Sequence, residues 1–246
     1  MTQPQSVFPF ISSSSYLEPN NQGVYELDEI DNSFTENQLS NNYALPQILI
    51  ISTYPPRECG IATYSQDLIQ SLDCKYRDSF QLNICAIEST GEKHNYQNNI
   101  TFILNTQNHN SFISLANYVN NTDAIKMVLI QHEFGLFNNC ENDFLELIYT
   151  INKPITICFH TVLPQPDNAL KTLVRKIYTA CNSVVVMTNT SAKILEADYQ
   201  LPIEKIKVIP HGTHLVAHTS KTILKKKYHL ENKTGSSVKV VETGFV

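Results

Sequence analysis

Four of the eight histidines in the chain follow short apolar runs, the pattern of strands buried on both faces. They are His132, His160, His211 and His214. An imidazole changes charge near neutral pH, so it can act as a general acid, a general base or a metal ligand. The carboxyl ends of parallel strands meet at one edge of a sheet, where ligands bind. We therefore expect these side chains to gather on one rim.

The loop after the first apolar run has features suited to binding an anion. Arg57 offers a planar guanidinium for phosphate or carboxylate, and Gly60 allows a ligand to approach the backbone closely. The helix predicted to follow, which begins near Ile61, would present free N–H groups. One glycine is a weaker signal than a full glycine-rich fingerprint, so a plain strand-to-helix turn explains the same residues. Chemistry alone leaves both interpretations open.

The other polar residues on the predicted rim also admit two interpretations. His132 and Glu133 are adjacent, so they could orient sugar hydroxyls or share a proton, or they could bond only to nearby backbone. His160 could serve a ligand or be a satisfied core histidine. Taken alone, His211, which precedes Gly212, would be a turn residue.

A zinc site is the main chemical alternative for these side chains. The residues able to ligate zinc are His132, Glu133, His160, His211 and His214. The sequence lacks H-E-x-x-H or a comparable local spacing. We therefore predict no metal and no cofactor.

Alternating strand and helix patterns fill residues 44–218. Strands are predicted over 47–52, 80–87, 100–104, 126–130, 154–159, 184–187 and 206–209, and the clearest amphipathic helix over 170–181. Asn189 or Thr190 is the expected cap of the last helix in this series. Strands separated by helices predict one α/β domain with a doubly wound parallel, Rossmann-like sheet.

The flanks differ from this domain. Residues 1–43 carry six acidic side chains and no lysine or arginine, which predicts a flexible acidic arm.

The formal net charge of -5 argues against a nucleic-acid binder, and the run Lys225-Lys226-Lys227 allows at most a peripheral membrane contact. The chain shows no secretory signal, and its six cysteines are irregularly spaced, so we predict a cytoplasmic protein with reduced thiols.

Four segments resemble the N-terminal domain of the bacterial group 1, or family 4, glycosyltransferases. They are Pro55-Pro56-x-x-Cys59-Gly60-Ile61-Ala62-Thr63-Tyr64, Gln131-His132-Glu133-Phe134-Gly135, His160-Thr161-Val162 and Val208-Ile209-Pro210-His211-Gly212. Their order and spacing match that family over roughly residues 46–230.

The resemblance implies a retaining transferase with a GT-B fold, in which two Rossmann-like domains face each other across a cleft. It implies a nucleotide-sugar and a glycan or sugar acceptor as substrates, without a divalent metal. On this pattern His160 is catalytic and lies near the transferred sugar, and Gly60 and Ile61, with Arg57, lie by the donor phosphates. His132, Glu133 and Phe134 would line the acceptor side, and His211 and Gly212 the hinge and cleft.

The last residues depart from the family pattern. The donor-binding domain should begin near Leu230, but residues 219–246 match only its start or an irregular tail. We therefore expect the 246 residues to be inactive alone and to need a separate polypeptide with the donor domain. The alternatives are a sugar or sugar-phosphate binding module without turnover and a truncated or frameshifted gene fragment.

Overall fold

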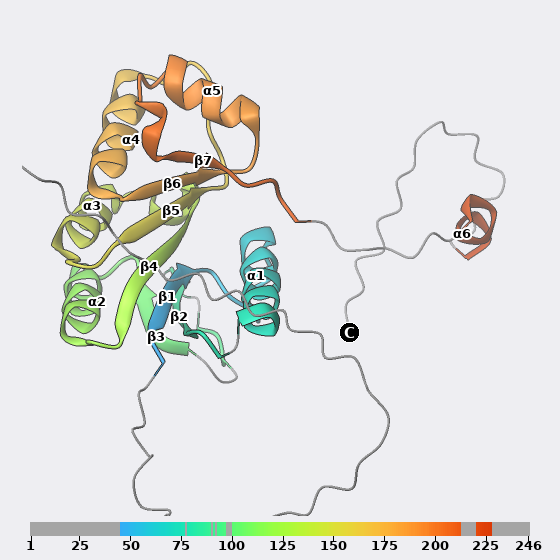
Figure 1. Ribbon diagram of the computed structural model, residues 1–246, viewed down its shortest axis with the longest axis horizontal. Helices are drawn as coiled ribbons and strands as arrows, with labels where there is room; N and C mark the ends of the chain where they lie inside the picture. The colour runs from blue at the N-terminus through green and yellow to red at the C-terminus, as the bar shows by residue number, and fades with distance from the viewer. Residues whose placement is uncertain are drawn as a thin grey trace, which may run out of the picture. The chain divides into compact units, whose positions relative to one another are not determined.

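The computed structural model describes residues 45–76, 78–89, 91, 93–96, 100–212 and 220–227. Within this part of the chain, one sheet has the strand order β3-β2-β1-β4-β5-β6-β7 (Figure 1). All neighbouring strands pair in parallel. The strands are β1 (Gln47–Ser52), β2 (Gln81–Glu88), β3 (Ile100–Asn105), β4 (Ile125–His132), β5 (Ile155–Phe159), β6 (Ser183–Val186) and β7 (Ile206–Val208). The predicted parallel Rossmann-like sheet is confirmed.

Strand β4 extends further than its apolar run indicated. The prediction ended it at Ile130, but Gln131 and His132 continue the pairing opposite Cys158 and Phe159 of β5. Both polar residues are buried, with exposed fractions of 1% and 2%. A strand predicted from its apolar residues ends too early here, because the polar residues at its carboxyl end still pair with the neighbouring strand.

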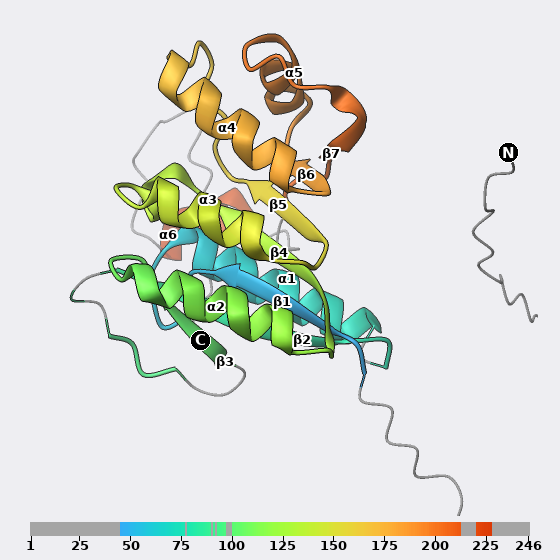
Figure 2. The same ribbon diagram turned by 90° about the vertical axis from the view of Figure 1, so that its left-hand side faces the viewer.

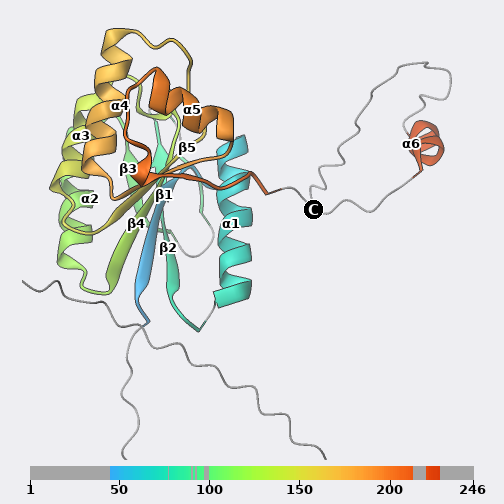
Figure 3. The same ribbon diagram turned by 45° about the horizontal axis from the view of Figure 1, so that its top comes forward.

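Helices cover both faces of the sheet. They are α1 (Gly60–Tyr76), α2 (His109–Asn121), α3 (Glu141–Thr150), α4 (Asn168–Ala180), α5 (Asn189–Ala197) and α6 (Lys221–Lys227), with short 3₁₀ turns η1 (Phe134–Phe137) and η2 (Ile203–Lys205). Helix α1 lies on the face opposite α2, α3 and α4 (Figures 1 and 3). Figure 2 shows α2, α3 and α4 side by side, and α3 contacts both of the others.

The two faces carry cores of different size. The larger core joins the sheet to α2, α3, α4 and α5, and includes Phe112, Phe144, Val174 and Leu195. On the α1 face the buried cluster consists of Ile50, Ile69 and Ile84, flanked by partly buried side chains. Helix α1 is therefore held by less apolar packing than the helices of the other face.

Polar contacts fix the helix ends. Asn108 caps α2, Asp167 caps α4 through the N–H of Leu170, and Thr188 caps α5 through the N–H of Ser191. The prediction of Asn189 or Thr190 as the α5 cap was wrong by one or two residues. Thr188 has extended backbone and a hydroxyl that reaches the first turn, whereas Asn189 is already helical.

Several predictions fall on residues outside the described part of the chain. These are the acidic arm 1–43, His214 and most of the predicted tail 219–246. Within the tail, Lys225, Lys226 and Lys227 form the last turn of α6. None of the helices described is long and apolar enough to cross a membrane.

Candidate functional site

Two histidines and a tyrosine meet at the carboxyl edge of the sheet. His160 follows β5, His211 follows β7, and Tyr64 lies in the first turns of α1. The ring of Tyr64 is 5.0 Å from the ring of His160, edge-on, and 4.9 Å from that of His211. We call these three residues the imidazole cluster. It brings together parts of the chain that are far apart in sequence.

Hydrogen bonds from β4 fix the position of His160. Its Nε2–H donates to Oε1 of the buried Gln131 at 2.8 Å, and its backbone N–H donates to the carbonyl of His132 at 3.0 Å. Burial lowers the pKa of His160 and nearby His211 lowers it further, while the carboxylate of Glu133 acts in the opposite direction. The neutral ring is thereby favoured, with Nε2 as donor and Nδ1 as hydrogen-bond acceptor.

The N-terminus of α1 leads into the same cluster. The N–H of Ala62 donates to Sγ of Cys59 at 3.4 Å, and the N–H of Thr63 donates to the Cys59 carbonyl at 3.2 Å. The N–H groups of Gly60 and Ile61, as the first of the helix, have no acceptor within it. The first turn contains no acidic side chain. This end of α1 therefore presents donors and a positive dipole end to an anion.

Space is available beside Gly60. A Cβ atom built on it meets no heavy atom within 4 Å. Arg57 lies in the preceding loop, and its Nη1–H donates to the carbonyl of Ile87 at 3.4 Å, near the end of β2. The structure thus places Arg57 beside the ends of β1 and β2. Its predicted contact with phosphate stays a prediction.

His132 lies on the other face of the sheet from the imidazole cluster. Successive side chains of a strand point to opposite faces, so Gln131 meets His160 while His132 enters the larger core. The rings around it are Phe134, Phe137, Phe144 and Phe159, with centroids 5.0 to 5.5 Å from its own. Burial, assisted by His160, lowers the pKa of His132 to about 3. Its Nδ1 has no hydrogen-bond partner among the described residues.

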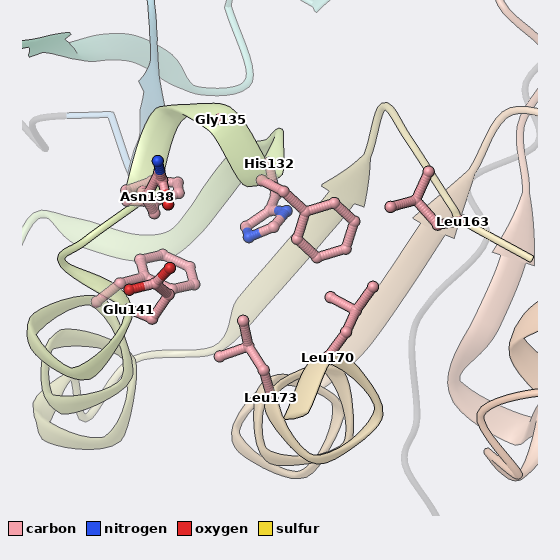
Figure 4. A pocket seen from close by; sticks show the side chains of 10 residues that line it. His132, Gly135, Asn138, Glu141, Leu163, Leu170 and Leu173 are labelled. Carbon is pink, nitrogen blue, oxygen red and sulfur yellow. The ribbon is translucent and has the colours of Figure 1, made fainter. Parts of the chain in front are cut away.

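His132 forms one wall of a pocket of about 260 Å³ (Figure 4). Phe134, Phe137, Phe144, Leu170 and Leu173 supply most of the remaining wall, with Asn138 and Glu141 as polar members. Figure 4 shows the imidazole between Glu141 and Leu163, opposite the leucines of α4. We call this the phenylalanine pocket.

A hydrogen bond joins the loops that separate the pocket from the imidazole cluster. The hydroxyl of Thr161 donates to Oε2 of Glu133 at 2.5 Å. The four histidines that were predicted to share one rim therefore do not all lie together. His160 and His211 meet, and His132 lies one residue beyond Gln131 on the opposite face, while His214 lies outside the described residues.

The residues that the structure groups as possible metal ligands are different ones. Ligand atoms of His109, Asp143 and Glu146 lie within 4.8 Å of one another, between α2 and α3. None of them was among the residues weighed for zinc. The group is largely exposed, and His109 Nδ1 already bonds to Asp143 Oδ1 at 2.8 Å.

Sequence reasoning missed two residues of the site. Tyr64 and Gln131 entered the prediction only as members of the motifs that resemble the family. One signal was available for Tyr64, because it lies four positions after Gly60, and residues at that spacing share a helix face. No local signal distinguishes Gln131, since its role depends on the pairing of β4 with β5.

Two solved structures are similar to this chain, and the first of them supports the fold. A glycosyltransferase from Rickettsia africae ESF-5 matches with a TM-score of 0.51 and 16% identity, over 76% of this chain and 50% of that one. An α-glucosyltransferase in complex with UDP and a 13-mer DNA matches with a TM-score of 0.44 and 12% identity, over 69% of this chain and 43% of that one. No protein-family model matches the sequence, and no curated protein matches it.

The chain spans about half the length of the Rickettsia protein. At this level of identity the likeness concerns the fold: an α/β, Rossmann-like domain shared with part of a glycosyltransferase. The predicted fold class agrees with it.

Proposed function

We propose that this domain is the acceptor-side half of a GT-B glycosyltransferase, which transfers a hexosyl group from a nucleotide-sugar to a glycan or sugar acceptor with retention. The observation that supports this best is the meeting of the α1 N-terminus with the imidazole cluster at the carboxyl edge of the sheet. The resemblance of the motifs around Gly60, His132, His160 and His211 to family 4 enzymes adds to it.

The N-terminus of α1 stabilises the leaving group. Departure of the nucleoside diphosphate moves negative charge onto the phosphate oxygen while the sugar becomes oxocarbenium-like. Fixed donors placed where this charge develops lower the barrier, because they need no reorganisation. The N–H groups of Gly60 and Ile61 meet this requirement, and Arg57 adds a cation to the same loop.

His160 orients the sugar being transferred. With Nε2–H bonded to Gln131, the neutral ring offers Nδ1 to a sugar hydroxyl. A neutral imidazole also avoids placing a second positive charge beside the oxocarbenium-like sugar. Tyr64 packs against this ring, and through His211 it connects α1 to the segment expected to form the hinge.

A transfer assay tests the proposal. Release of nucleoside diphosphate is measured from a panel of nucleotide-sugars with glycan acceptors, for the chain alone and together with a second polypeptide that carries a GT-B donor-binding domain. Activity is expected with the second polypeptide, and His160→Ala should reduce its rate roughly 10²–10³-fold, the usual effect of losing one stabilising group. His109→Ala, an exposed histidine on α2, is the matched control and should retain the rate. Equal rates for the two variants would refute the role of His160.

A further inference from the structure

The phenylalanine pocket is separate from the place where the donor phosphates are expected. It lies on the α3 and α4 face of the sheet, whereas α1 and its N-terminus lie on the other face. Its walls come from the end of β4, from η1 and α3, and from α4 with Leu163 ahead of it. Two of its residues, His132 and Phe134, are expected on the acceptor side by the family resemblance, which does not name the chemical class of the ligand.

The chemistry of the walls excludes a phosphate. No lysine or arginine lines the pocket, and the one charged side chain is the carboxylate of Glu141. Three polar side chains are also few for a sugar, whose ring carries a hydroxyl on almost every carbon. Aromatic and aliphatic walls with a few polar groups are typical of sites for apolar ligands. A cavity of about 150 Å³ holds benzene, so about 260 Å³ is enough for one ring with substituents.

The buried, unpaired nitrogen of His132 indicates that the ligand carries one polar atom. His132 is 2% exposed, and its Nδ1 has no partner among the described residues. A buried polar atom without a partner is unfavourable, and Nδ1 has almost no accessible surface, so a ligand hydroxyl reaches it only when the rings around it move apart, and a ligand that does so gains affinity. A hydroxyl suits this imidazole in either neutral tautomer, because it can donate and accept.

The segments that carry the pocket and the imidazole cluster are hydrogen-bonded to each other at the same edge of the sheet. The backbone N–H of His160 bonds to the carbonyl of His132, and the side chains of Thr161 and Glu133 join the two loops. We propose that the phenylalanine pocket binds an apolar, hydroxyl-bearing part of the acceptor, of about the size of a phenol. This assignment to the acceptor rests on the proposed glycosyltransferase function.

Binding of 4-fluorophenol, followed by ¹⁹F NMR, tests the pocket without requiring transfer. We expect saturable line broadening with the unmodified chain. Leu170→Trp fills the pocket from its partly buried rim and should abolish the broadening. Ile203→Trp, at a 46% exposed site on η2, is the matched control and should leave it intact. Absence of saturable binding, or equal binding to both variants, would overturn the proposal.

A second variant tests the polar contact. His132→Phe keeps an aromatic ring but removes both nitrogens, so 4-fluorophenol should bind about tenfold more weakly while fluorobenzene binding is unchanged. Equal losses for both probes would show that His132 acts only through packing. If this variant does not fold, the Leu170→Trp comparison still decides whether the pocket is occupied.

A third comparison separates the acceptor assignment from the pocket itself. 3-Fluoro-4-hydroxyphenyl β-glucoside, which keeps a free phenolic hydroxyl, should bind more tightly than 4-fluorophenol, and His160→Ala should weaken only the glucoside. If both probes bind alike in both proteins, the pocket is an apolar site unrelated to the acceptor. If the probes bind in the pocket as predicted but no nucleotide-sugar is turned over in the transfer assay, the proposed function is wrong. The pocket is then still a binding site for an apolar ligand.

Discussion

Gly60 combines two roles that a substitution can separate. Its backbone N–H is proposed to receive a donor phosphate, and the space beside it accepts a side chain. An aspartate at the start of a helix interacts favourably with the helix dipole. The same carboxylate would repel a phosphate at that position.

We therefore predict opposite effects of Gly60→Asp on stability and on binding. The free energy of unfolding should rise by about 0.3–1 kcal/mol, and nucleotide-sugar binding should weaken roughly ten- to hundredfold. Asn168→Asp, which adds the same charge at the first residue of α4, is the control for binding. Urea unfolding and calorimetric titration measure the two quantities. A loss of both stability and binding would instead indicate simple disruption of the loop.

His132 gives the stability a defined dependence on pH. Its pKa is about 3 in the folded chain and 6.5 when exposed, so between these values the unfolded state binds a proton that the folded state does not. Stability from this group is therefore present above pH 6.5 and is lost as the pH falls towards 3. The expected slope is about 1.4 kcal/mol per pH unit.

Urea unfolding at a series of pH values measures this slope. His132→Phe should flatten the dependence, leaving the smaller contribution in the same direction from His160, whose pKa is also lowered. Parallel curves for the two proteins would mean that His132 is protonated in the folded state.

Among the elements, α1 is held to the sheet by a small core and by a buried polar contact. The hydroxyls of Ser52 on β1 and Ser65 on α1 are 2.6 Å apart, and both residues are completely buried. Removing one hydroxyl leaves the other buried without this partner. The position of the α1 N-terminus at the rim depends on this attachment.

A double-mutant cycle tests the contact between Ser52 and Ser65. Each single change to alanine should cost about 1–3 kcal/mol, and the double variant should cost less than the sum, because no hydroxyl is then left unpaired. Urea unfolding gives the four free energies. Additive losses would show that the two hydroxyls do not depend on each other.

The sequence predicted the elements better than their contacts. Apolar periodicity found every strand to within two residues, because buried parallel strands read as continuous apolar runs. It placed His132 with His160, because both follow apolar runs, and could not reveal that β4 continues for two more residues. That extension sends Gln131 and His132 to opposite faces, and only strand pairing determines it.

At the scale of the whole molecule, the unequal cores predict unequal local stability. Helix α1 contributes Ile69 to a buried cluster of three isoleucines, whereas α3 lies within the larger core. Amide hydrogen exchange should therefore show α1 opening at a lower free energy than α3. A ligand that binds at the α1 N-terminus should slow exchange in α1 first. Equal protection of the two helices would contradict this account of the cores.

The central claim is that the rim formed by α1 and the imidazole cluster receives a nucleotide-sugar. Amide chemical-shift mapping during titration with UDP-glucose and GDP-mannose tests it most directly. The account predicts that at least one of them shifts the amides of Gly60 and Ile61, together with those of His160 and Gly212, in a saturable manner. Saturable shifts with either compound that are confined to other parts of the chain would contradict it.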